Sequence, residues 1–122
     1  MTPSPRTNLD RGREAEERAC RHLQQQGLTL SQRNYRSPYG EIDLVMQEHD
    51  TLVFVEVRFR ASASFGSPAE TVDARKQGRL RATAEHYRQN IPRASKKACR
   101  FDIVAITGDG EREDLRWLQD VF

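Results

Sequence analysis

The chain has 122 residues, of which 36% are apolar and 31% are charged, and its formal net charge is +2. This length fits one domain with a real hydrophobic core, and the composition is too apolar for a disordered chain. No apolar run approaches the roughly 20 residues that span a bilayer, and the N-terminus lacks the apolar stretch of a signal peptide. The two cysteines show no metal-binding or redox spacing. We therefore expect a single cytoplasmic domain over residues 11–122, with no membrane partner, behind a flexible tail over residues 1–10.

The charge is distributed unevenly along the chain. Residues 57–100 carry 11 basic and 3 acidic side chains, a net charge of +8, whereas the segments on either side are net acidic. Of the 20 basic residues 17 are arginines, whose planar guanidinium group suits phosphate. A basic middle segment predicts a polyanionic partner, with nucleic acid as the first candidate. A solvated basic helix face is the alternative reading.

A first helix is predicted to end at Gly27, with Asn8 or Asp10 as its N-cap. Its apolar stripe consists of side chains four residues apart: Ala15, Ala19 and Leu23. At about 100° per residue, Glu16 falls on the same stripe. We therefore expect its carboxylate to face the core.

Three strands are predicted next, at about residues 28–35, 41–47 and 51–59. The third has apolar residues on both faces, which indicates a central strand covered on both sides. Only a short polar gap, residues 48–50, separates the second strand from the third. The two strands are therefore expected to form a hairpin.

A second helix is predicted after a loop over residues 60–66. It begins with the capping-box pattern at residues 67–70, or restarts with Asp73 as a fresh cap, and runs to about Gln89. Lys76 lies within the apolar stripe of this helix. We therefore expect this lysine to point inward.

The last part of the chain adds further strands to the sheet. A basic loop over residues 91–98 leads to a fourth strand at 101–107, and the closing segment, 115–122, is expected to form a short edge strand. This order of elements favours an α/β domain with helices packed on a mixed sheet.

Three acidic side chains are predicted in or near the core. Asp43 and Glu56 lie in the middle of strands, and Glu16 lies on the buried helix face. Carboxylates that meet in a core repel each other, and their pKa values rise unless a cation neutralises them. Mg²⁺ or Mn²⁺ would do so with oxygen ligands, and would polarise a phosphodiester and activate water.

The hairpin register tests whether these carboxylates meet. If residues 49–50 form a two-residue turn, Asp43 lies opposite Glu56 on the same face of the sheet. A three-residue loop would place Asp43 opposite Val55. The two carboxylates would then lie on opposite faces unless a bulge intervenes.

These segments resemble the bacterial YraN family over nearly the whole of residues 11–122. The matching residues are Glu16-x-x-Ala19-x-x-x-Leu23-x-x-x-Gly27, Arg33-Asn34, Gly40-Glu41-Ile42-Asp43-Leu44, Val53-Phe54-Val55-Glu56-Val57-Arg58-x-Arg60, Phe65-Gly66, Lys76 and Arg100-Phe101-Asp102. The family is grouped with the PD-(D/E)XK nucleases and is similar to archaeal Holliday junction resolvases. The resemblance implies a restriction-endonuclease-like fold, with a mixed sheet flanked by helices. It also implies Glu16, Asp43 and Glu56 as metal ligands, and Glu56 and position 58 as catalytic positions.

Position 58 departs from the nuclease pattern, because it holds Arg58 instead of lysine. Arginine stays protonated and cannot act as a base, but it can stabilise charge on the phosphate. Lys76, pointing inward from its helix, is a candidate to supply the lysine from another element. The departure leaves open whether the protein is an enzyme.

The leading functional hypothesis is a Mg²⁺-dependent or Mn²⁺-dependent endonuclease acting on structured or branched DNA. Expected nucleic-acid contacts come from the basic residues Arg33, Arg36, Arg60, Arg75, Arg79, Lys96 and Lys97. Tyr35, Tyr39 and Phe65 are candidates to stack on bases. A homodimer would suit an enzyme that cuts both strands of a junction. Two alternatives stay open: a non-catalytic nucleic-acid-binding module on the same fold, and a protein-interaction domain with an acidic partner.

Each candidate residue also has a purely structural interpretation. Glu56 would then form an ion pair with Arg58 or Arg33, and Lys76 would extend along apolar surface with its charge in water. Asp102, beside Arg100 in the fourth strand, is either a further ligand or a structural partner, and the structural role is favoured.

Overall fold

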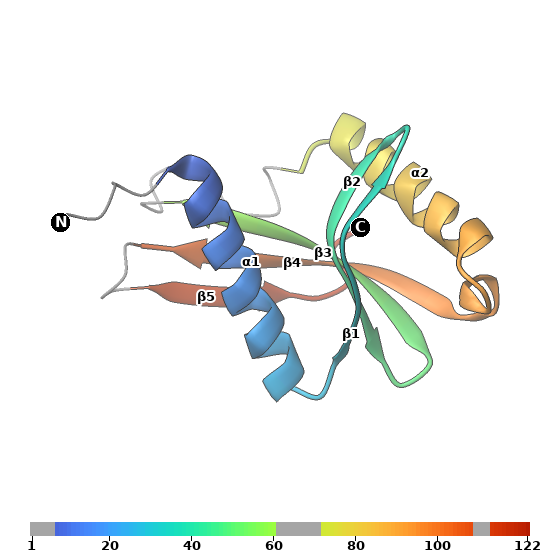
Figure 1. Cartoon of the computed structure of the whole chain (residues 1–122), viewed down its shortest axis with the longest axis horizontal. Helices are drawn as coiled ribbons and strands as arrows, with labels where there is room; N and C mark the ends of the chain where they lie inside the picture. Colours follow the sequence, from blue (N-terminus) through green and yellow to red (C-terminus); the bar gives the residue numbers. More distant parts are fainter. Residues whose placement is uncertain (1–6, 61–71, 109–112) are drawn as a thin grey trace, which may run out of the picture.

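The five strands form one mixed sheet in the order β1-β2-β3-β4-β5 (Figure 1). A computed structural model describes residues 7–60, 72–108 and 113–122. The strands are β1 (Thr29–Ser37), β2 (Gly40–Glu48), β3 (Thr51–Arg60), β4 (Ala98–Thr107) and β5 (Asp114–Leu118). β3 and β4 are parallel, whereas the other neighbouring strands are antiparallel. The predicted α/β architecture with a mixed sheet is confirmed.

Helix α1 (Asn8–Gln25) begins earlier than either predicted cap, Asn8 or Asp10, would allow. Thr7 is the N-cap, and its hydroxyl accepts from the backbone N–H of Asp10 at 3.1 Å. The Asp10 carboxylate in turn accepts from the N–H of Thr7, which completes a capping box. Residues 8–10 of the predicted tail therefore form the first turn of α1, and residues 1–6 lie outside the described part of the chain.

Helix α2 (Ala74–Asn90) starts at the second of the two predicted positions. Asp73 is its N-cap, and the carboxylate of Asp73 accepts from the N–H of Lys76 at 2.9 Å. The alternative capping box at residues 67–70 and the predicted loop beyond Arg60 fall outside the described residues. A 3₁₀ helix, η2 (Ala94–Lys96), interrupts the predicted basic loop before β4.

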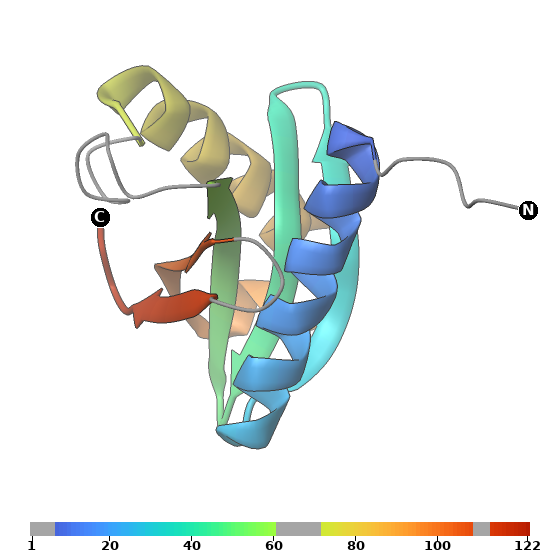
Figure 2. The ribbon, with the colours of Figure 1, turned by 90° about the vertical axis from the view of Figure 1, so that its left-hand side faces the viewer.

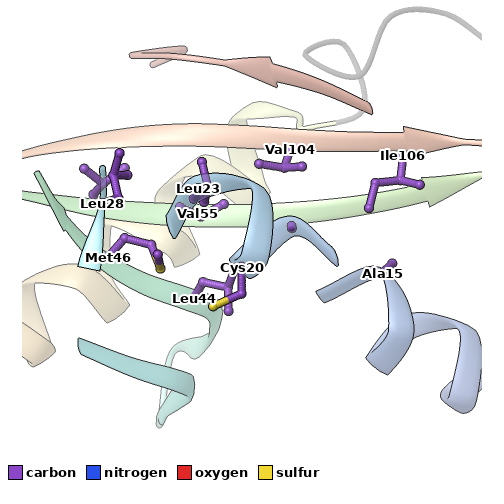
Figure 3. Close-up of a cluster of buried hydrophobic side chains, with 11 residues drawn as sticks. Ala15, Cys20, Leu23, Leu28, Leu44, Met46, Val55, Val104 and Ile106 are labelled. Atoms are coloured by element: carbon purple, nitrogen blue, oxygen red, sulfur yellow. The ribbon is translucent and has the colours of Figure 1, made fainter. Parts of the chain in front are cut away.

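The two helices cover opposite faces of the sheet (Figure 2). The cluster under α1 includes residues such as Leu23, Val55 and Val104, all of which are fully buried (Figure 3). The cluster under α2 includes Phe54 and Tyr87. Alternate residues of β3 thus serve both clusters, which confirms β3 as a central strand covered on both sides.

The β1–β2 hairpin diverges from β3 at one end of the sheet. A two-residue turn joins β2 to β3, and pairing of the two strands begins next to this turn with Glu48↔Thr51. The last pair is Leu44↔Val55. Beyond this point β3 continues beside β4, while the β1–β2 hairpin curves towards α2 (Figure 1). The fork between β2 and β3 opens next to Asp43 and Glu56.

None of the helices formed by the described residues has the length and apolar character needed to cross a membrane.

Asp102, in β4, is a buried carboxylate that several hydrogen-bond donors surround. Its carboxylate is 1% exposed and accepts hydrogen bonds from Arg100, from the Trp117 indole at 2.9 Å and from the N–H of Asp120 at 2.9 Å. Arg100 also donates to Glu48 at 2.9 Å. These contacts fit the favoured structural role of Asp102.

We expect Asp102→Ala to lower the free energy of unfolding by about 3 kcal/mol, because it removes the acceptor of the Trp117 indole N–H and one of the two carboxylates that neutralise the largely buried Arg100 guanidinium. Chemical denaturation measures this loss. Asp114→Ala, which removes an exposed carboxylate that pairs with the exposed Arg116 at 3.1 Å, is the matched control. Equal stability of the two variants would contradict the structural role of Asp102.

Candidate functional site

Asp43 occupies the fork where β2 leaves β3. Of the two turn lengths that the sequence left open, the structure has the two-residue turn, because Glu48 pairs with Thr51. Asp43 and Glu56 each come directly after the last pair of this register, which joins Leu44 and Val55. The Asp43 carboxylate accepts from the backbone N–H of Val57 at 2.8 Å. The side chain thereby bonds to β3 beyond the last backbone pair and is fixed in the opening of the fork.

Glu56 lies beside Asp43 and meets two cations. Its residue exposure is 8%, so its carboxylate is largely removed from water. The ammonium nitrogen of Lys76, from α2, is 2.8 Å from Glu56 Oε1, and Nε of Arg58 is 3.6 Å from the same oxygen. Lys76 therefore points inward, as the sequence predicts, and its ammonium group contacts the Glu56 carboxylate.

A pocket of about 300 Å³ opens at this fork. It is lined by residues of β2, β3, α2 and the β1–β2 turn: Tyr39, Gly40, Glu41, Asp43, Glu56, Lys76, Arg79 and Leu80. Three of these side chains are acidic and two are basic. An anionic substrate would therefore meet a surplus of negative charge unless a cation or a proton compensates it.

The surroundings of the pocket shift the pKa of the Asp43 carboxyl group. Burial, together with the nearby Glu56 carboxylate, raises the pKa of Asp43 to about 7, although the hydrogen bond from Val57 opposes this rise. Glu16 and Glu41 raise it further. The carboxyl group of Asp43 therefore titrates near neutral pH, as expected for a buried carboxyl group beside a second carboxylate.

Glu16, in α1, lies close enough to Asp43 and Glu56 for its charge to act on both. Burial raises the pKa of its carboxyl group, a hydrogen bond from the Asn34 side chain lowers it, and Glu41 raises it again. Asn34 has φ +50°, a left-handed conformation that asparagine adopts more readily than most residues. The predicted inward orientation is realised only in part, since Glu16 remains half-buried.

A protein metal site needs several donor atoms that converge on one point. Within residues 7–60, 72–108 and 113–122, no three Asp, Glu, His or Cys side chains converge closely enough to hold a metal ion. Asp43 and Glu56 do form a pair of neighbouring carboxylate donors. This donor chemistry fits Mg²⁺, which commonly binds one or two carboxylates and completes its shell with water and substrate phosphate.

The predicted nucleic-acid-binding residues fall into separate groups. Arg79 lines the pocket, and Arg75 is exposed on the same end of α2. Arg36 is exposed and lies 3.7 Å from Glu41. Arg60 ends β3.

The remaining basic candidates do not join this group. Arg33 forms an ion pair with Glu17 of α1 at 2.8 Å. Lys96 and Lys97 lie at the far end of the sheet, where β4 begins, and Lys97 donates to Gln47 at 2.8 Å.

Sequence reasoning missed Glu41 as a pocket residue, although it is two residues from Asp43 and so shares its side of a regular strand. Tyr39 is predicted from the sequence only as one of three stacking aromatics, not as part of a pocket. Of the other two, Tyr35 is buried and hydrogen-bonded to His86 at 2.6 Å, so its proposed stacking on bases is wrong, and Phe65 lies outside the described residues.

Comparison with known sequences assigns the chain to a family. Residues 15–106, about three quarters of the chain, match the family described as "Uncharacterised protein family UPF0102". The chain belongs to this family. The predicted resemblance is thereby confirmed, because YraN and UPF0102 denote the same family.

UPF0102 relatives match almost the whole chain. A UPF0102 protein of Nitrosococcus oceani is 46% identical over 118 residues, which cover 97% of this chain and 95% of the relative. One from Pseudomonas entomophila is 48% identical over 112 residues, covering 91% of each chain. One from Stutzerimonas stutzeri is 47% identical over 111 residues, covering 91% of this chain and 92% of the relative.

Proposed function

We propose that this UPF0102 protein is a metal-dependent endonuclease of the PD-(D/E)XK type that hydrolyses phosphodiester bonds in structured or branched DNA. The observation that carries the proposal is the juxtaposition of Asp43 and Glu56 at the fork, with the ammonium group of Lys76 2.8 Å from Glu56. A mixed sheet between two helices is compatible with that nuclease fold.

Asp43 and Glu56 are the residues that would hold a divalent cation, with Glu16 as a more distant contributor. When bound, such a cation supplies charge neutralisation at the phosphate and a lowered pKa for a coordinated water. Deprotonation of Asp43 is a condition for its acting as a ligand. Because its pKa without metal is about 7, binding of the cation at or below neutral pH would have to displace a proton from Asp43.

Lys76 is proposed to fill the place of the lysine that position 58 lacks. It reaches Glu56 from α2, so its positive charge lies where the attacked phosphate and the attacking water would meet. Arg58, at 3.6 Å from the same carboxylate, is proposed to stabilise charge on the phosphate, because a guanidinium group cannot give up its proton. Arg79 and Arg75 would position the DNA backbone along α2.

Cleavage of labelled DNA tests the proposal. Duplex, single strand, flap and four-way junction would be incubated with the protein and Mg²⁺, Mn²⁺ or EDTA. We expect cutting that requires the metal and favours the flap or junction. Tight binding without cutting would instead support a non-catalytic module on this fold, and failure to bind even at low salt would support a protein-interaction domain.

We expect Lys76→Ala to lower the rate of cleavage at saturating DNA roughly a hundredfold, a typical loss for one group that stabilises charge or moves a proton in a transition state. Single-turnover kinetics measures this rate. Arg75→Ala, a neighbouring exposed residue of α2, is the control and should weaken DNA binding without changing the saturated rate. Full activity of Lys76→Ala would refute the assignment of the lysine to α2.

A further inference from the structure

Tyr39 is an exposed aromatic side chain placed at the mouth of the pocket. It is 56% exposed, and Leu9 is the one other large apolar side chain that is exposed among the described residues. Tyr39 also lines the pocket that contains Asp43, Glu56 and Lys76. A single exposed aromatic residue needs no explanation by itself, but one beside convergent charged groups does.

The backbone that carries Tyr39 is fixed to α2. The N–H of Tyr39 donates to the Ser37 hydroxyl at 3.1 Å, and that hydroxyl is 3.0 Å from the hydroxyl of Thr83. The turn also lies close to the helix at Gly40, where an added Cβ would be in van der Waals contact with Thr83 Oγ1 at 3.4 Å. The tip of the β1–β2 hairpin accordingly lies beside α2 (Figure 1).

The ring itself is supported on one side. His86 makes an edge contact with Tyr39, with centroids 6.5 Å apart and an interplanar angle of 69°. His86 is held in turn by the Tyr35 hydroxyl, and Tyr35 packs edge-on against Tyr87 in the core. Among the described residues, the contact with His86 leaves Tyr39 56% exposed at the pocket mouth, where a flat ligand can reach the ring.

We propose that Tyr39 is a stacking platform for an unpaired DNA base, so that the pocket takes a strand with a single-stranded or unstacked nucleotide next to the phosphate it binds. A base within a duplex has both faces covered by its neighbours, whereas an unpaired base can place one face on the phenol ring. Lys76 and Arg79, on the same pocket wall, provide the positive charge for the adjoining phosphate. This inference rests on the proposed function, since it names the form of DNA that the same site prefers.

The test measures binding without cleavage. In an Asp43→Asn background, the affinities for a short single-stranded oligonucleotide and for its duplex would be compared by fluorescence anisotropy. We expect Tyr39→Ala to weaken single-strand binding about tenfold, to leave duplex binding unchanged, and to abolish the quenching of a 2-aminopurine base in the strand. Tyr39→Phe should retain both properties. Leu9→Ala, at the other exposed apolar residue, is the matched control and should change neither.

The outcomes separate this inference from the proposed function. Unchanged single-strand affinity in Tyr39→Ala, or an equal loss of duplex affinity, would overturn the stacking role, while metal-dependent cleavage by the wild type would still support the nuclease. The converse result, binding that depends on Tyr39 with no cleavage of any DNA, would overturn the nuclease and keep the platform.

Discussion

Asp43→Asn and Glu56→Gln should each reduce metal-dependent cleavage by roughly three orders of magnitude. Each substitution keeps the shape of the side chain and removes an anionic oxygen donor from the fork. A metal ion contributes several kcal/mol to transition-state stabilisation, and about 1.4 kcal/mol corresponds to a factor of ten in rate. Single-turnover cleavage of a flap or junction in Mg²⁺ measures the loss.

The controls for these two variants lie on the surface of the same protein. Asp50→Asn alters the exposed β2–β3 turn, and Glu85→Gln alters an exposed position of α2. Both should cleave at the wild-type rate. If Asp43→Asn and Glu56→Gln were as active as these controls, the two carboxylates at the fork would not be the site of chemistry.

The same Asp43→Asn substitution should stabilise the folded protein at alkaline pH. The pKa of Asp43 is raised from an ordinary value of 3.8 to about 7 in the folded state, chiefly by burial. One pKa unit corresponds to about 1.4 kcal/mol, so keeping this carboxyl group ionised in the fold costs up to about 4 kcal/mol at pH 8. Asparagine avoids the ionisation, and its side-chain oxygen can still accept from Val57.

The sign of the pH dependence follows from proton binding. Between about pH 4 and pH 7 the folded protein holds a proton on Asp43 that the unfolded chain has released. The contribution of Asp43 to stability is therefore full below pH 4 and is lost as the pH rises through 7. The gain in the free energy of unfolding from Asp43→Asn should therefore increase with pH. It should rise to up to about 4 kcal/mol at pH 8, and at pH 5 it should be roughly a third of that value.

Thermal and urea denaturation at pH 5 and pH 8 measure this difference. Asp50→Asn serves again as the control and should show no pH-dependent gain. Addition of Mg²⁺ at pH 8 should stabilise the wild type and leave Asp43→Asn unchanged, because only the native carboxylate pair binds the ion. A variant that is inactive and yet more stable would show that lost activity does not come from misfolding. An unchanged pH profile would contradict the burial of an ionisable Asp43.

The order and type of the elements could be predicted from local sequence because their signals are local. Four-residue spacing of Ala15, Ala19 and Leu23 predicted α1, and apolar residues on both faces of residues 51–59 predicted a central strand. The boundaries were less accurate where side chains outside the periodic pattern decide them. The Thr7 cap shows this, since it precedes the first apolar turn and competes with two equally suitable residues.

The pairing of Asp43 with Glu56 was predictable only as a condition. The sequence allowed a two-residue or a three-residue turn, and one residue of register moves a side chain to the other face of the sheet. Packing of both faces of β3 selects the register observed, because a slip would expose the buried residues of β2. The inward orientation of Lys76 was likewise visible in the periodicity of α2, whereas its contact with Glu56 depends on how α2 crosses the sheet.

Local patterns and motifs were enough to predict the family, the α/β class, the central strand and the presence of acidic residues in or near the core. Other features depend on how distant segments pack. They are the departure of β2 from β3 at Asp43, the contact of Lys76 with Glu56, and the burial of Tyr35 while Tyr39, four residues away, is exposed at the pocket. The physical reason is that strand divergence and helix placement result from the packing of distant segments, so no short stretch of sequence encodes them.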